Sequence, residues 1–439
     1  MAVRRVALLV TLLALALGGC TARSRLLLGF DTPAPVQTFD IVLPWDTPAP
    51  GTTTDPNGGD QGDQGDQGDQ GDTGDQVDQG DPGDQLSFDP EASLVDAPQL
   101  QVQLVQFPNA RVAGFFAADV QGFYDQYELD VLVNPADPSI DPTGEVMDPD
   151  NETQFLFAPA LVVMKADEAG DDLVNIAQIY QRSGIHIASL SDAGITTASQ
   201  LATLTKPLAV MPYGRDMDAV ASLVAAGLNP SSLKTKVADP FDPTAFAGGD
   251  PIAAEVTYED EYAQILETQN GQASGLITPD QVNLIDLTTA QYATLQEGIY
   301  ASATWLAQPG NDQIAVRFLA AVMRGWIYCR DDLTDCAQTA YESGGDRPTQ
   351  HQMWVLNEAN ALIWPSPNGI GVLDQNAWQQ TAQLGINAGL LTAAPKPEET
   401  RSDLATAALG LLTDVDTTGA GFTKTTVQIT AGGEDPATP

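Results

Sequence analysis

Polar side chains with ligand-binding chemistry stand at three places where a β-rich run of the sequence gives way to a helical run. Ligands of α/β sheets bind beyond the carboxyl ends of the strands, so these side chains are expected to face one cleft. Backbone N–H groups at a helix start also suit an acceptor or an anion. A helix N-cap and a favourable place in a helix dipole remain the alternatives for Asn109 and Glu261. The candidates are Asn109, Tyr213, Gly214, Arg215, Tyr258 and Glu261.

Aromatic side chains that could hold a flat ligand form a second group of candidates. A heteroaromatic ligand needs flat apolar faces together with a few fixed donors and acceptors. The candidates are Phe115, Phe116, Trp326 and Trp364. A place in the core is the alternative for each of them. Trp364 opens the run WPSPNGIG, whose prolines and glycines predict a rigid loop that lines the cleft or caps helices.

The composition excludes several kinds of chemistry. The chain has two histidines and three cysteines, with no CxxC pair, so zinc and histidine-based catalytic centres are disfavoured. Its formal charge of −41 argues against nucleic acid and anionic membranes as partners. Cys329 and Cys336 lie on either side of a predicted helix-to-helix turn, where either a disulfide or two free buried thiols fit.

The N-terminal part predicts export and a tether. Arg4 and Arg5 precede a short apolar run that ends in Gly18-Gly19-Cys20, which is the pattern of a signal peptide over residues 1–20. Its ending resembles the bacterial lipobox and predicts acylation of Cys20, with an ordinary secretory signal as the alternative. Thr21 leaves the choice between inner and outer membrane open. Residues 21–97, rich in Gly, Asp and Gln, have little apolar surface and predict a disordered tether.

The elements that position the candidates follow from residue 98 onward. Short β-rich runs alternate with helical runs, which is typical of an α/β sheet. One series covers residues 98–187, a second covers 188–302, and residues 303–395 are almost wholly helical. This order predicts two lobes with a cleft between them, the helical stretch completing the first lobe. The insertion 134–153 is acidic, and the tail 396–439 is polar with one helix predicted over 403–412.

Five phrases in order resemble the solute-binding components of ABC importers, in the family that also holds binders of thiamine pyrimidine precursors and thiamine pyrimidine synthases. The phrases are FPNARVAGFFAADVQGFYDQYELDVLV, AQIYQRSGIHIASLSDAGI, TYEDEYAQILE, FLAAVMRGWIYCRDD and WVLNEANALIWPSPNGIGVLDQNAW. The resemblance implies a type II periplasmic-binding fold whose hinge strands fall at residues 185–190 and 297–302. It implies a lipid-anchored, monomeric binding protein outside the cytoplasm, with a small-molecule ligand, an ABC permease as partner, and no cofactor.

The ligand stays open among three expectations. The first is a thiamine-precursor aminopyrimidine, received by the carboxylate of Glu261. The second is a small anion such as a sulfonate or nitrate, for which the nearby cations are Arg111, Arg182 and Arg215. The third is an enzyme like the synthase, which the missing cysteine cluster and the export signal disfavour. TYEDEYA carries one residue more than the family's usual run, which could shift the role from Glu261 to Glu259.

Overall fold

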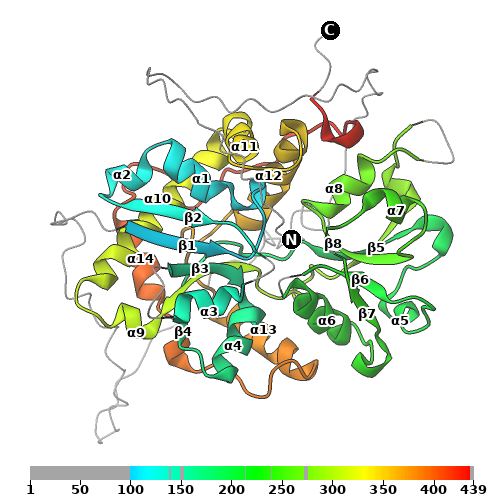
Figure 1. The fold of residues 1–439 in the computed structure, drawn as a ribbon, viewed down its shortest axis with the longest axis horizontal. Coiled ribbons are helices and arrows are strands. Elements are labelled where there is room, and N and C mark those ends of the chain that lie inside the picture. The colour runs from blue at the N-terminus through cyan, green and yellow to red at the C-terminus, as the bar shows by residue number, and fades with distance from the viewer. Residues whose placement is uncertain are drawn as a thin grey trace, which may run out of the picture. The chain divides into compact units, whose positions relative to one another are not determined.

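The computed structural model describes residues 99–137, 140–148, 153–212, 214–238, 240–270 and 275–435. The predicted signal peptide, Cys20 and the predicted tether lie outside the described residues, as does Tyr213. Within the described part of the chain, the strands form two separate five-stranded sheets, each with its own helices (Figure 1). We call the part built on the first sheet lobe 1 and the part built on the second sheet lobe 2.

The first sheet has the strand order β2-β1-β3-β10-β4. Strand β1 is parallel to β2 and β3, whereas β10 is antiparallel to its neighbours β3 and β4. The strand that returns late in the sequence is therefore inserted between two early ones. The bounds are β1 Gln99–Leu104, β2 Asp130–Asn134, β3 Thr153–Pro159, β4 Leu173–Gln178 and β10 Glu297–Ser302.

Both faces of the first sheet are covered by helices. Phe155 and Phe157 of β3 enter one apolar cluster, with α1, α10 and α14, while Leu156 and Ala158 enter another, with α4 and α13. This alternation is the period of two expected of a strand that is buried on both faces. The helices of lobe 1 are α1 Ala113–Val120, α2 Phe123–Gln126, α3 Pro142–Met147, α4 Ala160–Ala169, α9 Ala303–Leu306, α10 Asn311–Asp331, α11 Leu333–Glu342, α12 Thr349–Ile363, α13 Gln375–Asn387 and α14 Ser402–Gly410.

The second sheet has the order β7-β6-β8-β5-β9. Strand β5 is antiparallel to β8 and β9, and β6 is parallel to β7 and β8. Its strands are β5 Ile185–Leu190, β6 Leu208–Val210, β7 Thr235–Val237, β8 Ala253–Thr257 and β9 Val282–Asp286. Its helices are α5 Ala198–Leu201, α6 Arg215–Ala225, α7 Pro243–Ala247 and α8 Glu261–Leu266. The sequence pattern did not predict β9 or α7.

The chain passes from one sheet to the other twice. The first passage lies between β4 and β5, and the second lies between β9 and β10. The two runs predicted as hinge strands are β5 and β10, each the first strand after a passage. Two sheets of mixed direction joined by two passages are the predicted type II periplasmic-binding fold, which is thereby confirmed.

Residues 111–127 do not form one continuous helix. Residues Ala110–Val112 form a 3-10 turn, α1 follows, and Gly122 with a φ of 71° separates α1 from α2. Glycine adopts this left-handed conformation at little cost, which lets the chain turn toward β2. The acidic insertion also has structure, because α3 lies within it and begins at Asp141, whose side chain accepts a hydrogen bond from the Thr143 amide.

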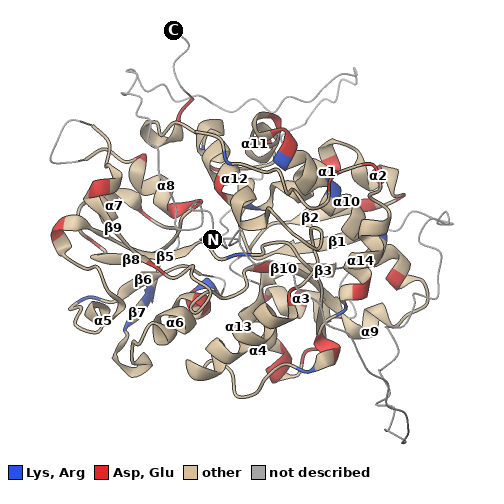
Figure 2. Ribbon diagram, turned by 180° about the vertical axis from the view of Figure 1, so that it is seen from behind, with Lys and Arg blue, Asp and Glu red and all other residues tan. Residues whose placement is uncertain are grey.

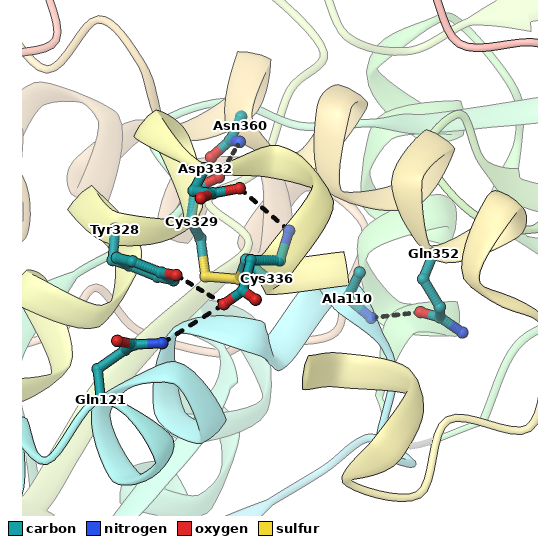
Figure 3. The surroundings of a disulfide bond; sticks show 9 residues. Ala110, Gln121, Tyr328, Cys329, Asp332, Cys336, Gln352 and Asn360 are labelled. Carbon is teal, nitrogen blue, oxygen red and sulfur yellow. Dashed lines mark hydrogen bonds between the residues drawn. A yellow bond between two sulfur atoms is a disulfide. The ribbon is translucent and has the colours of Figure 1, made fainter. Parts of the chain in front are cut away.

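A disulfide joins Cys329 of α10 to Cys336 of α11 (Figure 3). Both residues are buried in the apolar cluster of lobe 1. Asp332 lies between the two helices and accepts a hydrogen bond of 3.1 Å from the Asp335 amide. Asn360 of α12 donates to the Cys329 carbonyl at 3.1 Å. The bridge therefore fixes the corner where three helices of lobe 1 meet.

The C-terminal segment, residues 396–435, packs against both lobes. Its helix α14 buries Leu404 in the interior of lobe 1 beside α10. Further on, Val427 and Ile429 are buried in the cluster that contains β8 and α8 of lobe 2. The helix predicted over 403–412 is α14, and the buried apolar side chains give the described part of this segment a packed course.

Acidic residues greatly outnumber basic residues. Acidic residues are spread over many elements of both lobes, whereas basic residues are few (Figure 2). The sequence has 59 acidic and 18 basic residues, so most carboxylates have no cation to pair with. None of the helices in the described ranges is long and apolar enough to cross a membrane.

Candidate ligand-binding cleft

A cleft is lined by side chains of both lobes. It has an empty volume of about 720 Å³, which includes open solvent. Small-molecule sites hold a ligand between apolar surfaces and a few polar groups, and the lining of this cleft offers both. Lobe 1 contributes Val105, Gln106, Phe107 and Arg111, lobe 2 contributes Met211, Pro212, Arg215, Ala238, Pro240, Phe241, Asp260, Glu261 and Gln264, and Asp346 and Arg347 precede α12.

Asn109 caps a turn in lobe 1 and also contacts lobe 2. Its side-chain oxygen accepts a hydrogen bond of 2.9 Å from the Arg111 amide, which caps the 3-10 turn after β1. Its side-chain nitrogen donates to Asp260 Oδ2 of lobe 2 at 3.0 Å. A single amide therefore caps the 3-10 turn of lobe 1 and connects the two lobes beside the cleft.

Arg111 is a buried cation that is already neutralised. Its Nη2 lies 2.9 and 3.1 Å from the two carboxylate oxygens of Glu297, and its Nε lies 3.3 Å from Glu259 Oε1. Burial alone would lower the pKa of Arg111, but Glu297 and Glu259 raise it well above its ordinary value. Gln106 also donates to Glu297. An anion entering the cleft would have to compete with these carboxylates for the guanidinium.

Glu261 is bound in the same way by Arg215. The two form a bidentate pair with both nitrogen-to-oxygen distances at 3.0 Å, and Glu261 Oε2 also accepts from the Thr257 amide and hydroxyl at 2.8 Å each. Glu261 lines the cleft, but Arg215 already neutralises its charge, and its role in receiving a ligand stays a prediction. Each oxygen already accepts hydrogen bonds from the protein, so the residue holds α6 to the end of β8.

Gly214 lies where lobe 2 approaches lobe 1 closely. It precedes α6 with a φ of 82°, and a Cβ at this position would lie 2.1 Å from Val162 Cγ2 of α4. Any larger residue would push lobe 2 away from lobe 1 at this point. Gly214 therefore places Arg215 at the cleft by letting α6 lie against α4.

Asp260 is the cleft carboxylate that the sequence analysis missed. Its side chain is 11% exposed, and its oxygens accept from Asn109 at 3.0 Å and from Gln264 at 2.7 Å. Burial would raise the pKa of Asp260, but the contact with His351 and the bond from Gln264 lower it below its ordinary range. The group is therefore an anion at neutral pH. Glu259, Asp260 and Glu261 are adjacent in the sequence, and no pattern separates them.

Two further buried carboxylates lie close to the arginines of the cleft. Burial raises the pKa of Glu255 and of Glu259 to about 7, against the opposing effects of Arg215 and Arg111. Glu255 accepts a hydrogen bond of 2.9 Å from the Met211 amide. Near neutral pH these two carboxyl groups are therefore only partly ionised.

The other candidate cations differ in position. Arg182 donates to the carbonyls of Trp364 at 3.3 Å and Pro365 at 2.9 Å, so it fixes the loop after α12 and does not line the cleft. Arg347 lines the cleft and donates to Gln264 Oε1 at 2.6 Å. Among the described residues Arg347 is the cleft arginine for which no ion pair is found.

The predicted aromatic contacts lie mainly in the interior. Phe115, Trp326 and Trp364 are each no more than 1% exposed and belong to the apolar cluster of lobe 1, which corrects their assignment to the ligand. Phe116 packs against the same cluster. Tyr258 is buried in lobe 2, with its ring 4.8 Å from that of Tyr262. Their contact with the ligand was predicted from sequence position alone. Neighbouring helices cover these rings in the fold.

Phe107 was not predicted and lies in the cleft. Its side chain is 48% exposed, which is unusual for a large apolar residue that follows a buried strand. Phe241 of lobe 2 lines the same cleft. The cleft therefore offers aromatic surface from both lobes. No group of three or more His, Cys, Asp or Glu side chains in the described ranges is arranged to hold a metal ion.

Comparison with solved structures shows the fold. The periplasmic nitrate-binding protein NrtA from Synechocystis PCC 6803 superposes with a TM-score of 0.54 at 15% identity, covering 75% of this chain and 94% of that one. The alkanesulfonate-binding protein SsuA from Xanthomonas axonopodis pv. citri, bound to MOPS, gives 0.52 at 14%, covering 70% and 99%. A ligand-binding component of an ABC-type import system from Staphylococcus aureus, with zinc bound, gives 0.51 at 11%, covering 71% and 98%.

Comparison of the sequence with models of protein families identifies the family. None of the curated proteins compared with the chain matches it. The model of the family described as NMT1/THI5 like matches residues 109–332. This range contains Asn109, Arg111, Arg215 and Asp260, so it covers the cleft from both lobes. The match extends over half of the sequence, and the chain therefore belongs to the NMT1/THI5-like family.

Proposed function

We propose that the protein is an extracytoplasmic solute-binding component of an ABC importer, which captures a small molecule by closure of its two lobes. The family, the fold and a cleft lined from both lobes support this proposal. Binding is favoured over catalysis because the chain has three cysteines, too few for the cysteine-rich motif of the synthase, and Cys329 and Cys336 form a disulfide.

The proposed ligand is a thiamine-precursor aminopyrimidine. The observation that carries this choice is Asp260, an ionised carboxylate in a cleft whose two buried arginines are paired with glutamates. An amino group beside a ring nitrogen that can carry a proton offers two donors to such a carboxylate, in a charge-assisted contact. Phe107 and Phe241 supply aromatic surface of the kind that a flat ring prefers.

A small anion is the second candidate, favoured by Arg347. This residue lines the cleft, and the one hydrogen bond found for its side chain goes to a neutral amide. The guanidinium therefore keeps its positive charge available to a sulfonate or nitrate. Two of the solved structures with this fold are described as nitrate-binding and alkanesulfonate-binding proteins.

Calorimetry distinguishes the candidates. The purified chain is titrated separately with a thiamine-precursor aminopyrimidine, an aliphatic sulfonate and nitrate. We expect saturable heat with the aminopyrimidine alone. Binding of the sulfonate or nitrate alone would establish the second candidate. Absence of heat with all three, together with no small molecule released on denaturation of freshly purified protein, would contradict the proposed function.

The location rests on residues outside the described ranges. We propose that Cys20 is acylated and that residues 21–97 tether the binding domain to the cell-envelope membrane. The substitution Cys20→Ser is expected to move the protein from the detergent phase to the aqueous phase without changing ligand affinity. Deletion of residues 59–85 is expected to leave the thermal midpoint unchanged. A substituted protein that stays in the detergent phase would remove the anchor from the proposal.

A further inference from the structure

His351 is buried between two carboxylates at the edge of the cleft. It lies near the start of α12, with Nδ1 2.9 and 3.0 Å from the two oxygens of Glu267 and Nε2 3.4 Å from Asp260 Oδ1. The side chain is 1% exposed. Asp260 and Glu267 lie on either side of α8, so one imidazole spans both ends of this helix of lobe 2. Asp260, at the N-terminal end of α8, is the carboxylate that lines the cleft.

The C-terminal segment, residues 396–435, also packs against His351 and Glu267. The Gly432 amide donates to the Glu267 carbonyl at 2.9 Å, and the Gln428 carbonyl accepts from Gln350 of α12 at 2.8 Å. A Cβ on Gly433 would lie 2.5 Å from His351 Cβ and 3.2 Å from the Glu267 carboxylate. The segment lies outside the range that the family model matches. Gly433 therefore covers His351 and Glu267 with bare backbone, because a side chain at this position would not fit.

The charges around His351 favour its cationic form. Burial lowers its pKa, and the N-terminal turn of a helix also disfavours a cation. Glu267 and Asp260 outweigh both effects and raise the pKa of His351 to about 9. Arg111 acts on Asp260 from the lobe 1 side, and Arg347 lies ahead of α12, hydrogen-bonded to Gln264. The C-terminal segment contributes glycine backbone at this point and no charge.

We infer that His351, held between Glu267 and Asp260 under the C-terminal segment, is a positioning residue that fixes the carboxylate of Asp260 in the ligand cleft. A doubly protonated imidazole donates to both carboxylates at once, whereas a neutral imidazole has a single N–H and can serve only one of them. Loss of the second donor frees Asp260 to turn away from Asn109 and from the ligand. The effect on ligand affinity rests on the proposed function, but the arrangement itself can be tested without ligand.

The first test is an NMR titration of the intact chain. The chain has two histidines, so two imidazole signals are expected, and His351→Gln identifies one of them by its loss. We expect the His351 signal to titrate near pH 9 and to move to lower pH in Asp260→Asn. His186, which is buried and contacts the Gly184 carbonyl at 3.0 Å, is expected to titrate below its ordinary range in both proteins. A His351 titration at or below its ordinary value would overturn the inference.

The second test uses a matched pair of glycines. Gly432 and Gly433 both have left-handed backbone, with φ of 63° and 71°, so an alanine is strained at either position. No atom lies within 4 Å of a Cβ on Gly432, whereas a Cβ on Gly433 meets His351. Gly433→Ala is therefore expected to shift the His351 titration, and Gly432→Ala is expected to leave it unchanged. Equal shifts in both variants, or none in either, would contradict the role given to the segment.

The third test concerns affinity and its dependence on pH. With the aminopyrimidine as probe, His351→Gln is expected to bind about tenfold more weakly at pH 7, because a charge-assisted contact to Asp260 is lost. Wild-type affinity should decline as pH rises through 9, and the variant should lack this decline. An unchanged affinity and pH profile in a variant with wild-type circular dichroism would overturn the positioning role. Failure of the wild type to bind the aminopyrimidine would instead count against the proposed ligand.

Discussion

The interior of lobe 1 and the cleft are both buried, but different forces hold them together. In the interior, Phe155 stacks on Phe318 with ring centroids 3.9 Å apart, and Phe115 meets Phe157 edge to face at 4.9 Å. In the cleft, Arg111 and Arg215 are each surrounded by glutamates. Apolar packing depends on volume and is indifferent to pH, whereas paired charges depend on protonation. The interior should therefore be most sensitive to substitutions that change volume, and the cleft to substitutions that remove a charge.

The largest loss of stability is expected from added volume in the interior. Helices α1 and α10 cross so closely that a Cβ on Gly325 would lie 2.0 Å from the Gly114 carbonyl oxygen. Because that neighbour is backbone, Gly325→Ala should lower the free energy of unfolding by about 3 kcal/mol or more. Gly410→Ala in α14 is the control, since no atom lies within 4 Å of its Cβ. Equal urea midpoints for the two variants would refute the close crossing.

A somewhat smaller loss is expected from removal of a charge in the cleft. Glu261→Gln keeps the shape but leaves Arg215 buried without its carboxylate, which should lower the free energy of unfolding by about 2 kcal/mol. The double variant Arg215→Met with Glu261→Gln should recover part of this loss, because the uncompensated charge is gone. If the single variant were as stable as the wild type in urea unfolding, the pair would not be a structural element.

The smallest expected effect is the response of stability to pH. Burial raises the pKa of Glu255 and Glu259 to about 7, so the folded state keeps protons that the unfolded state releases near pH 4–5. The two carboxylates raise the pKa of His351 to about 9, so its stabilising charge is complete below its unfolded value and lost as pH rises through 9. Both effects predict a thermal midpoint that falls between pH 6 and 9.5.

Two variants separate the contributions to this fall. Glu259→Gln should flatten the dependence near pH 7, and His351→Gln should flatten it near pH 9. Gly410→Ala, which changes no charge, should keep the full dependence. A wild-type midpoint that rose from pH 6 to pH 9.5 would contradict the assigned directions of these pKa shifts.

The sequence predicted features that depend on local pattern. Alternating β-rich and helical runs gave the α/β class, and β5 and β10 were recognised where the chain passes between sheets. The N-cap role of Asn109 was recognised as an alternative because Asn between a strand and a helix commonly caps the helix. Cys329 and Cys336 were close enough in the sequence for a bridge to be weighed, although a bridge could not be distinguished from two free thiols.

Features that depend on distant partners could not be predicted. Glu261 looked available because Arg215, 46 residues earlier, was not known to be its partner. Phe115 and Trp326 resembled ligand contacts because the crossing of α1 and α10, which buries both, is a tertiary contact. The C-terminal segment looked like a polar tail because its buried residues, such as Val427 and Ile429, are few and widely spaced.

Calorimetry of Asp260→Asn with the thiamine-precursor aminopyrimidine tests the central claim most directly. The amide keeps the shape of the carboxylate but loses its charge and one acceptor, so affinity should fall about tenfold to a hundredfold. Asp192→Asn, an exposed acid of lobe 2 away from the cleft, is the control and should bind as the wild type does. Wild-type affinity in Asp260→Asn, or tighter binding of a sulfonate or nitrate than of the aminopyrimidine by the unsubstituted chain, would contradict the account.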